Sequence, residues 1–223
     1  MSLKMTKSRF FAPLRMTRTL EAAGKPTELV ETTDGSRVLL LPYGGRVLGL
    51  YTPTDDENFY WTNTALATTG AAREFFASDK WQNSGGDRTW LSPEVDVFLP
   101  SFPALDKYWQ PRELDPGNYR IEQTPDGVRL VNRLTLTLSR SRLQVDLEIG
   151  KSVGPAPNPL RYERGMDIDG VEYAGYTQHT SFTRPGTNGR SSCAASASTR
   201  RGSISMSRGP IRRTWATLPR HAT

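Results

Sequence analysis

The sequence has only one cysteine, Cys193, in 223 residues. A single cysteine excludes a framework of intrachain disulfides as a source of stability. Long apolar runs are also missing, and none approaches the roughly 18 residues of a membrane-spanning helix, so we expect no membrane partner. The basic N-terminus holds one short apolar block, residues 10–14, which Pro13 interrupts. Because this block is too short for the core of a secretory signal, we expect a cytoplasmic protein, or a periplasmic or secreted one if translation starts elsewhere.

Acidic side chains are absent from the end of the chain. Residues 183–223 contain eight arginines but no lysine, aspartate or glutamate, whereas residues 1–182 contain 21 basic and 23 acidic residues. The net charge of +6 therefore arises entirely within the last 41 residues. This tail cannot bury enough apolar surface to extend a core. Its mixture of arginine with serine, alanine and threonine resembles GC-rich DNA translated in the wrong reading frame, which favours a frameshift near residue 183. The alternative is a genuine disordered, Arg/Ser/Ala-rich tail.

A basic tail raises the question of nucleic-acid binding. Tails with that function usually concentrate their charge in blocks and mix lysine with arginine, which this tail does not do. The charge excess alone indicates only a general tendency to associate with anions, so we expect no nucleic-acid partner.

The chain does contain many turn-forming residues, with 19 glycines and 16 prolines. Short apolar segments alternate with turn signals such as Asp34-Gly35, which is typical of an antiparallel β protein. Leu143–Ile149 alternates strictly between apolar and polar residues, which predicts a half-buried strand. Residues 1–24 show no period and are expected to be a disordered basic arm, followed by one all-β domain over residues 25–182. The expected strands are 27–33, 37–41, 46–51, 59–61, 95–99, 119–123, 128–133, 134–138, 143–149 and 171–182, with one or two helical turns at 71–76.

The motif from Gly85 to Glu94 combines a tight turn with polar and aromatic side chains. Its two glycines permit a sharp turn or a close approach of the backbone to a ligand. Carboxylates and a guanidinium can hydrogen-bond sugar hydroxyls, and an indole face can pack on the C–H surface of a sugar ring. The alternative is a structural turn in which the charged groups pair with neighbours and the indole lies in the core. The candidate sugar-binding residues are Arg46, Asp87, Arg88, Trp90 and Glu94.

Three stretches within residues 27–182 resemble the N-terminal part of a galactose mutarotase-like protein of the aldose 1-epimerase superfamily, in particular an uncharacterised bacterial branch. They are residues 41–48 (Leu-Pro-Tyr-Gly-Gly-Arg-Val-Leu), residues 59–63 (Phe-Tyr-Trp-Thr-Asn) and residues 85–94. The resemblance implies a large antiparallel β-sandwich, the supersandwich of that family, which this chain leaves incomplete at the C-terminus. It also implies a small sugar or a glycan as the ligand, with no cofactor and no metal.

The activity that the resemblance implies is the interconversion of sugar anomers. In this family a histidine protonates the ring oxygen while a carboxylate removes the proton of the anomeric hydroxyl, so that the ring opens and recloses. Residues 176–182 (Tyr-Thr-Gln-His-Thr-Ser-Phe) are similar to the family's histidine strand, which makes His179 the candidate acid. The family's base is a glutamate on a late strand, whereas no acidic residue follows Glu172 here. The catalytic pair is therefore expected to be incomplete.

Two functions remain open from the sequence. One is an aldose 1-epimerase-type isomerase that is inactive as this chain stands, and the other is a non-catalytic carbohydrate-binding or structural β-sandwich. They differ in whether a carboxylate, Asp87 or Glu94, faces His179. If C-terminal strands are missing, the strands at 143–149 and 171–182 lose partners, which predicts a poorly folded or aggregation-prone product. The sequence carries no signal for an oligomeric state.

Overall fold

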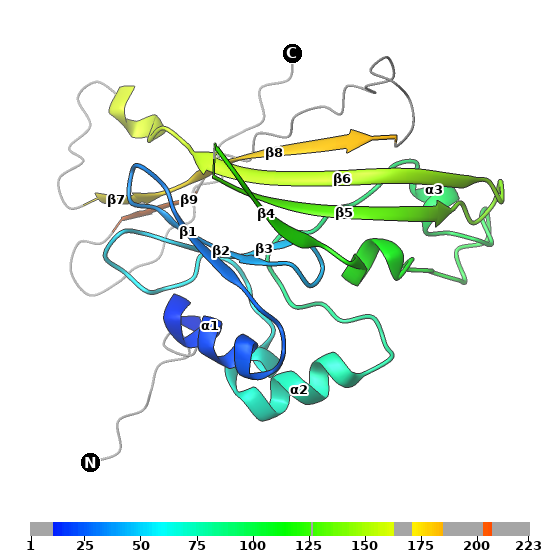
Figure 1. The fold of residues 1–223 in the computed structure, drawn as a ribbon, viewed down its shortest axis with the longest axis horizontal. Helices are drawn as coiled ribbons and strands as arrows, with labels where there is room; N and C mark the ends of the chain where they lie inside the picture. The colour runs from blue at the N-terminus through cyan, green and yellow to red at the C-terminus, as the bar shows by residue number, and fades with distance from the viewer. Residues whose placement is uncertain (1–10, 126, 163–170, 185–202, 207–223) are drawn as a thin grey trace.

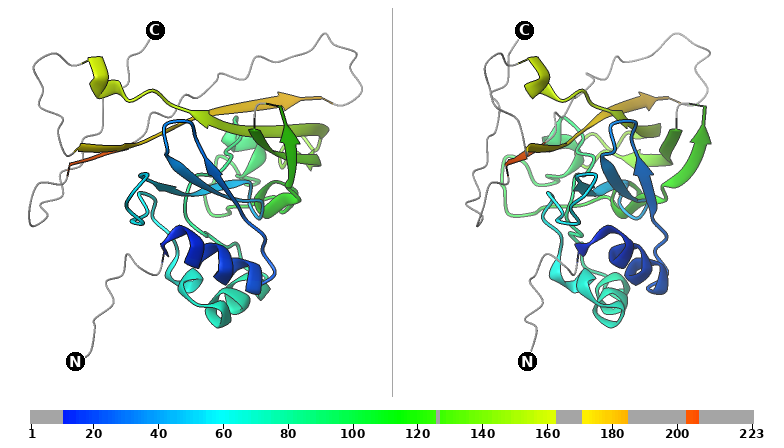
Figure 2. Two further views of the ribbon diagram at one scale, coloured as in Figure 1. Left: turned by 60° about the vertical axis from the view of Figure 1, so that its left-hand side comes forward. Right: turned by 90° about the vertical axis from the view of Figure 1, so that its left-hand side faces the viewer.

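A computed structural model of the chain describes residues 11–125, 127–162, 171–184 and 203–206. These residues form antiparallel sheets and helices that stack in layers (Figure 1). Helices α1 (Pro13–Ala22) and α2 (Thr69–Ala77) form one outer layer. The turned views show a three-stranded sheet between these helices and a larger four-stranded sheet (Figure 2). The prediction of a β-rich antiparallel fold is confirmed, whereas α1 and a helical layer that covers one sheet were not predicted.

The middle sheet consists of β1 (Glu28–Glu31), β2 (Arg37–Leu41) and β3 (Arg46–Tyr51), in that order. Neighbouring strands pair antiparallel, with a bulge between Leu39 and Leu40. One face of this sheet packs on the helices and the other on the larger sheet, so that β2 and β3 are buried along almost their whole length. Burial on both faces explains their continuous apolar runs. The predicted strands at 37–41 and 46–51 are confirmed.

The larger sheet has the strand order β4–β5–β6–β8 and is antiparallel throughout. Its strands are β4 (Arg120–Thr124), β5 (Gly127–Thr137), β6 (Gln144–Pro155) and β8 (Tyr176–Thr183). β5 is one continuous strand where the sequence predicted two. The inner face of this sheet and the facing side chains of β2 and β3 form the main core, which includes Val38, Leu40, Val47, Leu50, Leu130, Leu134, Leu136, Ile149 and Val153.

β6 is an inner strand of the larger sheet, although the sequence predicted that its first part would lack a strand partner. β6 pairs with β5 over Gln144–Ser152 and with β8 over Glu148–Pro155. The expected loss of partners is therefore wrong for residues 148 and 149, whereas residues 144–147 have a described strand partner on the β5 side alone. Within the described ranges, β8 is an edge strand of this sheet, and its outer side carries no strand partner. The alternation predicted in β6 is present, because Val145, Leu147 and Ile149 are more buried than their polar neighbours Gln144 and Asp146.

Helix α1 lies in the segment that the sequence predicted as a disordered arm, and that prediction is wrong for residues 13–22. Pro13 occupies the first turn, where its missing N–H costs no helical hydrogen bond. Met16 and Leu20, one turn apart, are fully buried against the middle sheet. Flanking arginines obscured this short apolar stripe in the sequence, and residues 1–10 of the arm lie outside the described residues. The helix predicted at 71–76 is confirmed as α2, and no helix in the described ranges is long and apolar enough to cross a membrane.

Two predicted strands have other conformations. Residues 95–99 begin instead with a short helix, α3 (Glu94–Val97). Its Asp96 accepts hydrogen bonds from the backbone N–H groups of Arg140 and Ser141, which anchors the helix to the β5–β6 hairpin. Residues 59–61 do not form a strand, since the Asn58 side chain accepts the Leu50 and Tyr60 N–H groups in place of a β-ladder.

The predicted strand at 171–182 is divided at Gly175 into β7 (Val171–Ala174) and β8. The N–H of Gly175 donates to the Ser36 hydroxyl, and the two strands join different sheets. β7 pairs antiparallel with β9 (Ser203–Met206), which belongs to the tail predicted as disordered over residues 183–223. That prediction is wrong for these four residues. The tail at 185–202 and 207–223 lies outside the described residues.

Two buried tyrosines predict a loss of stability at high pH. Burial raises the pKa of Tyr51 well above its ordinary value and raises the pKa of Tyr119 to about 12. Above a pH of about 10 the unfolded chain ionises these phenols while the folded chain keeps them protonated. The free energy of unfolding should therefore be fully retained below pH 10. Above it, that free energy should fall by up to about 1.4 kcal/mol per pH unit for each tyrosine. Urea unfolding from pH 8 to 11.5 measures this slope, and an equal slope in a Tyr119→Phe variant would contradict the assignment.

Candidate functional site

The glycines of the Gly85–Glu94 motif bring backbones together. Gly85 forms a β-bridge with Thr62, and the N–H of Gly86 donates to the Trp61 carbonyl at 3.0 Å. Both glycines have positive φ, and a Cβ on Gly86 would lie 2.2 Å from the Val47 carbonyl oxygen. The motif therefore packs directly against β3. The glycines are required because two backbone segments of the chain lie too close together for a side chain. This agrees with the alternative in which the motif is a structural turn.

Asp87 links the two sheets. Its carboxylate lies 3.2 Å from Nζ of Lys151 on β6 and accepts the backbone N–H of Val47 at 2.6 Å. The Lys151 ammonium also donates to the Gly45 carbonyl at 2.6 Å. Both side chains are almost fully buried, at 2% and 3% exposed. Asp87 is thus an internal ion-pair partner and does not reach a ligand.

Arg46 forms a second buried ion pair. It is 1% exposed, and its Nη2 lies 3.0 Å from the Asp115 carboxylate. Its Nη1 donates to the Gly85 carbonyl at 3.1 Å, which ties β3 to the glycine turn. The Asp115 carboxylate also accepts the indole N–H of Trp81 at 3.2 Å. Arg46 is therefore a buried structural residue that orients the Asp115 carboxylate, which in turn holds the indole of Trp81.

Arg88, Trp90 and Glu94 form a separate cluster. The guanidinium of Arg88 lies 4.3 Å from the ring centre of Trp90 and 4.7 Å from that of Trp81, which are cation–π distances. Trp90 stacks on Phe98 with ring centres 4.2 Å apart, and its indole N–H donates to Glu94 at 2.5 Å. These contacts are with other protein groups. Arg88 contacts Trp81, and Trp90 stacks on Tyr108; both of these partners line a neighbouring pocket.

The pocket beside this cluster has a volume of about 250 Å³. Three of its aromatic side chains, Trp81, Tyr108 and Trp109, are between 42% and 51% exposed. They offer ring surface to solvent next to the buried polar groups Asp115 and Gln82. The residues that line it are Tyr43, Asp79, Lys80, Trp81, Gln82, Tyr108, Trp109, Gln110, Arg112, Asp115 and Pro116.

Hydrogen bonds hold the pocket walls in place. The Tyr43 hydroxyl donates to the Gln82 side-chain carbonyl, and the Gln82 amide donates to the Ser78 carbonyl. Arg112 joins the two loops that form the walls, because its Nη1 donates to the Asp79 carbonyl at 3.1 Å. Burial raises the pKa of Tyr43, and the nearby Arg112 partly opposes this shift. The floor of the pocket is therefore preorganised and polar, with a cation close to the Tyr43 hydroxyl.

None of the five sugar-binding candidates named from the sequence lines this pocket. Arg46 and Arg88 contact residues that do, whereas Asp87 is buried between the sheets. The sequence does contain a signal for the pocket. Two tryptophans and a tyrosine occur in loops on either side of the glycine motif, and loops carry a disproportionate share of binding residues.

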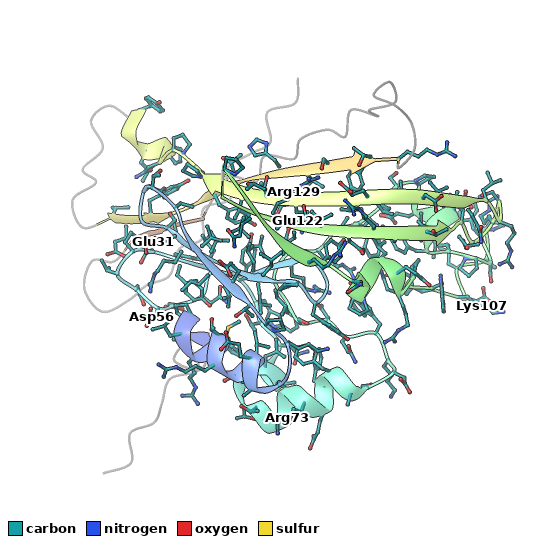
Figure 3. All side chains as sticks on the ribbon, viewed as in Figure 1. Glu31, Asp56, Arg73, Lys107, Glu122 and Arg129 are labelled. Atoms are coloured by element: carbon teal, nitrogen blue, oxygen red, sulfur yellow. The ribbon has the colours of Figure 1, made fainter. Side chains whose placement is uncertain are left out.

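His179 lies away from the candidate carboxylates. It pairs in register with Ser152, which pairs with Arg129, so these three residues share the outer face of the larger sheet. Lys151 and its partner Asp87 belong to the opposite, inner face. Arg129 and Glu122 of this sheet are labelled in Figure 3. His179 is exposed and does not meet Asp87.

Glu94 is also remote from His179. Its helix is fixed to the β5–β6 hairpin through Asp96, next to the start of β6 at Gln144. His179 pairs with Ser152, eight residues further along β6, which corresponds to roughly 26 Å at about 3.3 Å per residue. The structure thus brings neither candidate base to the candidate acid.

The described residues contain no group of three or more histidine, cysteine, aspartate or glutamate side chains that could hold a metal ion. Comparisons with protein-family models, with curated proteins and with solved structures gave no match for this chain. Its function is therefore inferred from the geometry of its own residues.

Proposed function

We propose that this protein is a non-catalytic carbohydrate-binding domain with a mutarotase-like β-sandwich, and that the sugar binds in the pocket lined by Trp81, Tyr108 and Trp109. The observation that carries this proposal is the combination of half-exposed aromatic rings with a preorganised polar floor in one pocket. Two antiparallel sheets that share one core support the sandwich architecture.

The pocket offers groups for both the apolar surface and the hydroxyl groups of a sugar ring. The faces of Trp81 and Trp109 can cover the apolar C–H surface of a pyranose. Gln110, Arg112 and the Tyr43 hydroxyl offer donors and acceptors for the sugar hydroxyls. A volume of about 250 Å³ lies below the range of about 300–1,000 Å³ typical of drug-sized ligands, which favours a single sugar residue.

The proposal does not include ring opening. Anomer interconversion needs an acid and a base positioned at one sugar. His179 is on the outer face of the larger sheet, and Asp87 is buried against Lys151. In a polarimetric assay with α-D-galactose or α-D-glucose we expect no acceleration over buffer. An acceleration that a His179→Asn variant abolishes would establish the isomerase alternative.

The decisive test of sugar binding compares two tryptophan variants. We expect titration calorimetry with galactose, glucose, galacturonate and glucuronate to detect binding of at least one of them. Trp109→Ala should weaken that binding by up to about tenfold, because it removes a stacking surface. Trp61→Ala is the matched control, since Trp61 is 62% exposed but does not line the pocket. Failure of all four sugars to bind, or equal binding by the Trp109 variant, would contradict the proposal.

A further inference from the structure

We infer that the sugar bound in this pocket carries an anionic group, a carboxylate or a phosphate, which the guanidinium of Arg112 binds. This inference rests on the proposed carbohydrate-binding function and specifies the class of sugar. It is carried by the charge balance of the pocket and by the position of Arg112.

The pocket has an uncompensated positive charge. Its charged lining residues are Asp79, Lys80, Arg112 and Asp115. The Asp115 carboxylate already accepts hydrogen bonds from Arg46 and Trp81, and its charge is neutralised by the buried Arg46 guanidinium. Two cations and one carboxylate, Asp79, therefore remain. A neutral sugar would leave this excess charge unmatched.

A further cation lies behind the aromatic wall. The Arg88 guanidinium is 4.7 Å from the ring centre of Trp81. Its Nη1 is buried without a hydrogen-bond partner among the described residues. Glu94 in the same cluster accepts the indole N–H of Trp90, a neutral donor, and keeps its negative charge. Arg88 and Glu94 therefore leave the charge balance of the pocket unchanged, and its excess positive charge comes from Lys80 and Arg112.

Arg112 is positioned to bind the anionic group. Its link from Nη1 to the Asp79 carbonyl holds the side chain across the junction of the two wall loops. A guanidinium has five N–H donors in a planar fork that matches a carboxylate or a phosphate. Among the charges that act on the Tyr43 hydroxyl, Arg112 has the largest effect on the Tyr43 pKa and exceeds Asp115. At the Tyr43 hydroxyl the positive charge of Arg112 thus outweighs the negative charge of Asp115.

The test uses matched pairs of sugars. Galacturonate is compared with galactose, and glucose 6-phosphate with glucose, by titration calorimetry on the full chain at low ionic strength. We expect the anionic member of at least one pair to bind about tenfold or more tightly, since hydrogen bonds between charged groups are the stronger class. The pair that shows this preference identifies the anionic group. The preference should shrink as salt is added.

Two arginine variants test whether Arg112 causes the preference for the anionic sugar. In Arg112→Gln the ratio of anionic to neutral affinity should fall close to one. In Arg120→Gln, which changes an exposed arginine of β4 outside the pocket, the ratio should stay as in the parent. Equal affinity for both members of each pair would overturn the inference while leaving carbohydrate binding intact, provided that Trp109→Ala still weakens it. A preference that survives Arg112→Gln would also overturn it. Absence of binding by all four probes would overturn the inference and would also contradict the proposed function.

Discussion

Replacing Asp87 with alanine should lower the free energy of unfolding by about 3–5 kcal/mol, because it leaves the ammonium of Lys151 buried without its counter-ion. Lys151 is 3% exposed and has little access to water. The substitution also removes the acceptor of the Val47 N–H. Urea unfolding at pH 7, followed by far-UV circular dichroism, measures the loss.

Two further variants test whether the ion pair causes this effect. Asp56→Ala removes the carboxylate of an exposed pair with Arg37, at the position labelled in Figure 3, and should cost no more than about 1 kcal/mol. The double variant Asp87→Ala/Lys151→Met removes both charges and should regain much of the lost stability. A double variant as unstable as Asp87→Ala alone would show that the ion pair is not the cause.

Replacing Gly86 with alanine should lower the free energy of unfolding by about 2–5 kcal/mol, because the new side chain would be strained by the left-handed backbone and would clash with β3. Gly86 has a φ of +67°, and an added Cβ would lie 2.2 Å from the Val47 carbonyl oxygen and 2.8 Å from the Leu48 Cα. Both are backbone atoms of β3, which cannot move without disturbing the core between the sheets. Thermal unfolding and hydrogen exchange at β3 report the change.

Gly70 provides the matched control for this substitution. It lies in helix α2, has no positive φ, and an added Cβ would meet no atom within 4 Å. Gly70→Ala should therefore raise stability by about 0.5–1 kcal/mol through helix propensity. A Gly86→Ala variant with parental stability would refute the close packing of the glycine turn on β3.

The candidate site could be predicted only in part. The glycine motif stood out in the sequence because its residue types suit a sugar, yet Asp87 and Arg46 are used in buried ion pairs. Which carboxylate pairs with which cation depends on residues far apart in the chain, such as Asp87 and Lys151, and no local pattern encodes that pairing. The pocket is formed by loops at residues 79–82 and 108–116, whose proximity follows from the fold.

The face of the sheet on which His179 lies could not be predicted from the sequence either. Strand periodicity predicted a β-strand there, and β8 is present. Whether its odd or even residues face the core depends on its register against β6, and a shift by one residue would reverse every side chain. The observed register places His179 with Ser152 on the outer face. The sequence motif around it could not supply that information.

The sequence by itself determined the antiparallel β-rich class, the positions of β2 and β3 and the first half of β6, because alternation, apolar runs and glycine turns act over a few neighbouring residues. It also indicated that Gly85 and Gly86 adopt a backbone conformation that favours glycine, as their positive φ angles show. Only the tertiary structure decided the docking of α1 on the middle sheet, the pairing of Asp87 with Lys151, and the assembly of the aromatic pocket. These features depend on contacts between distant segments, which are selected by burial and charge compensation across the whole core.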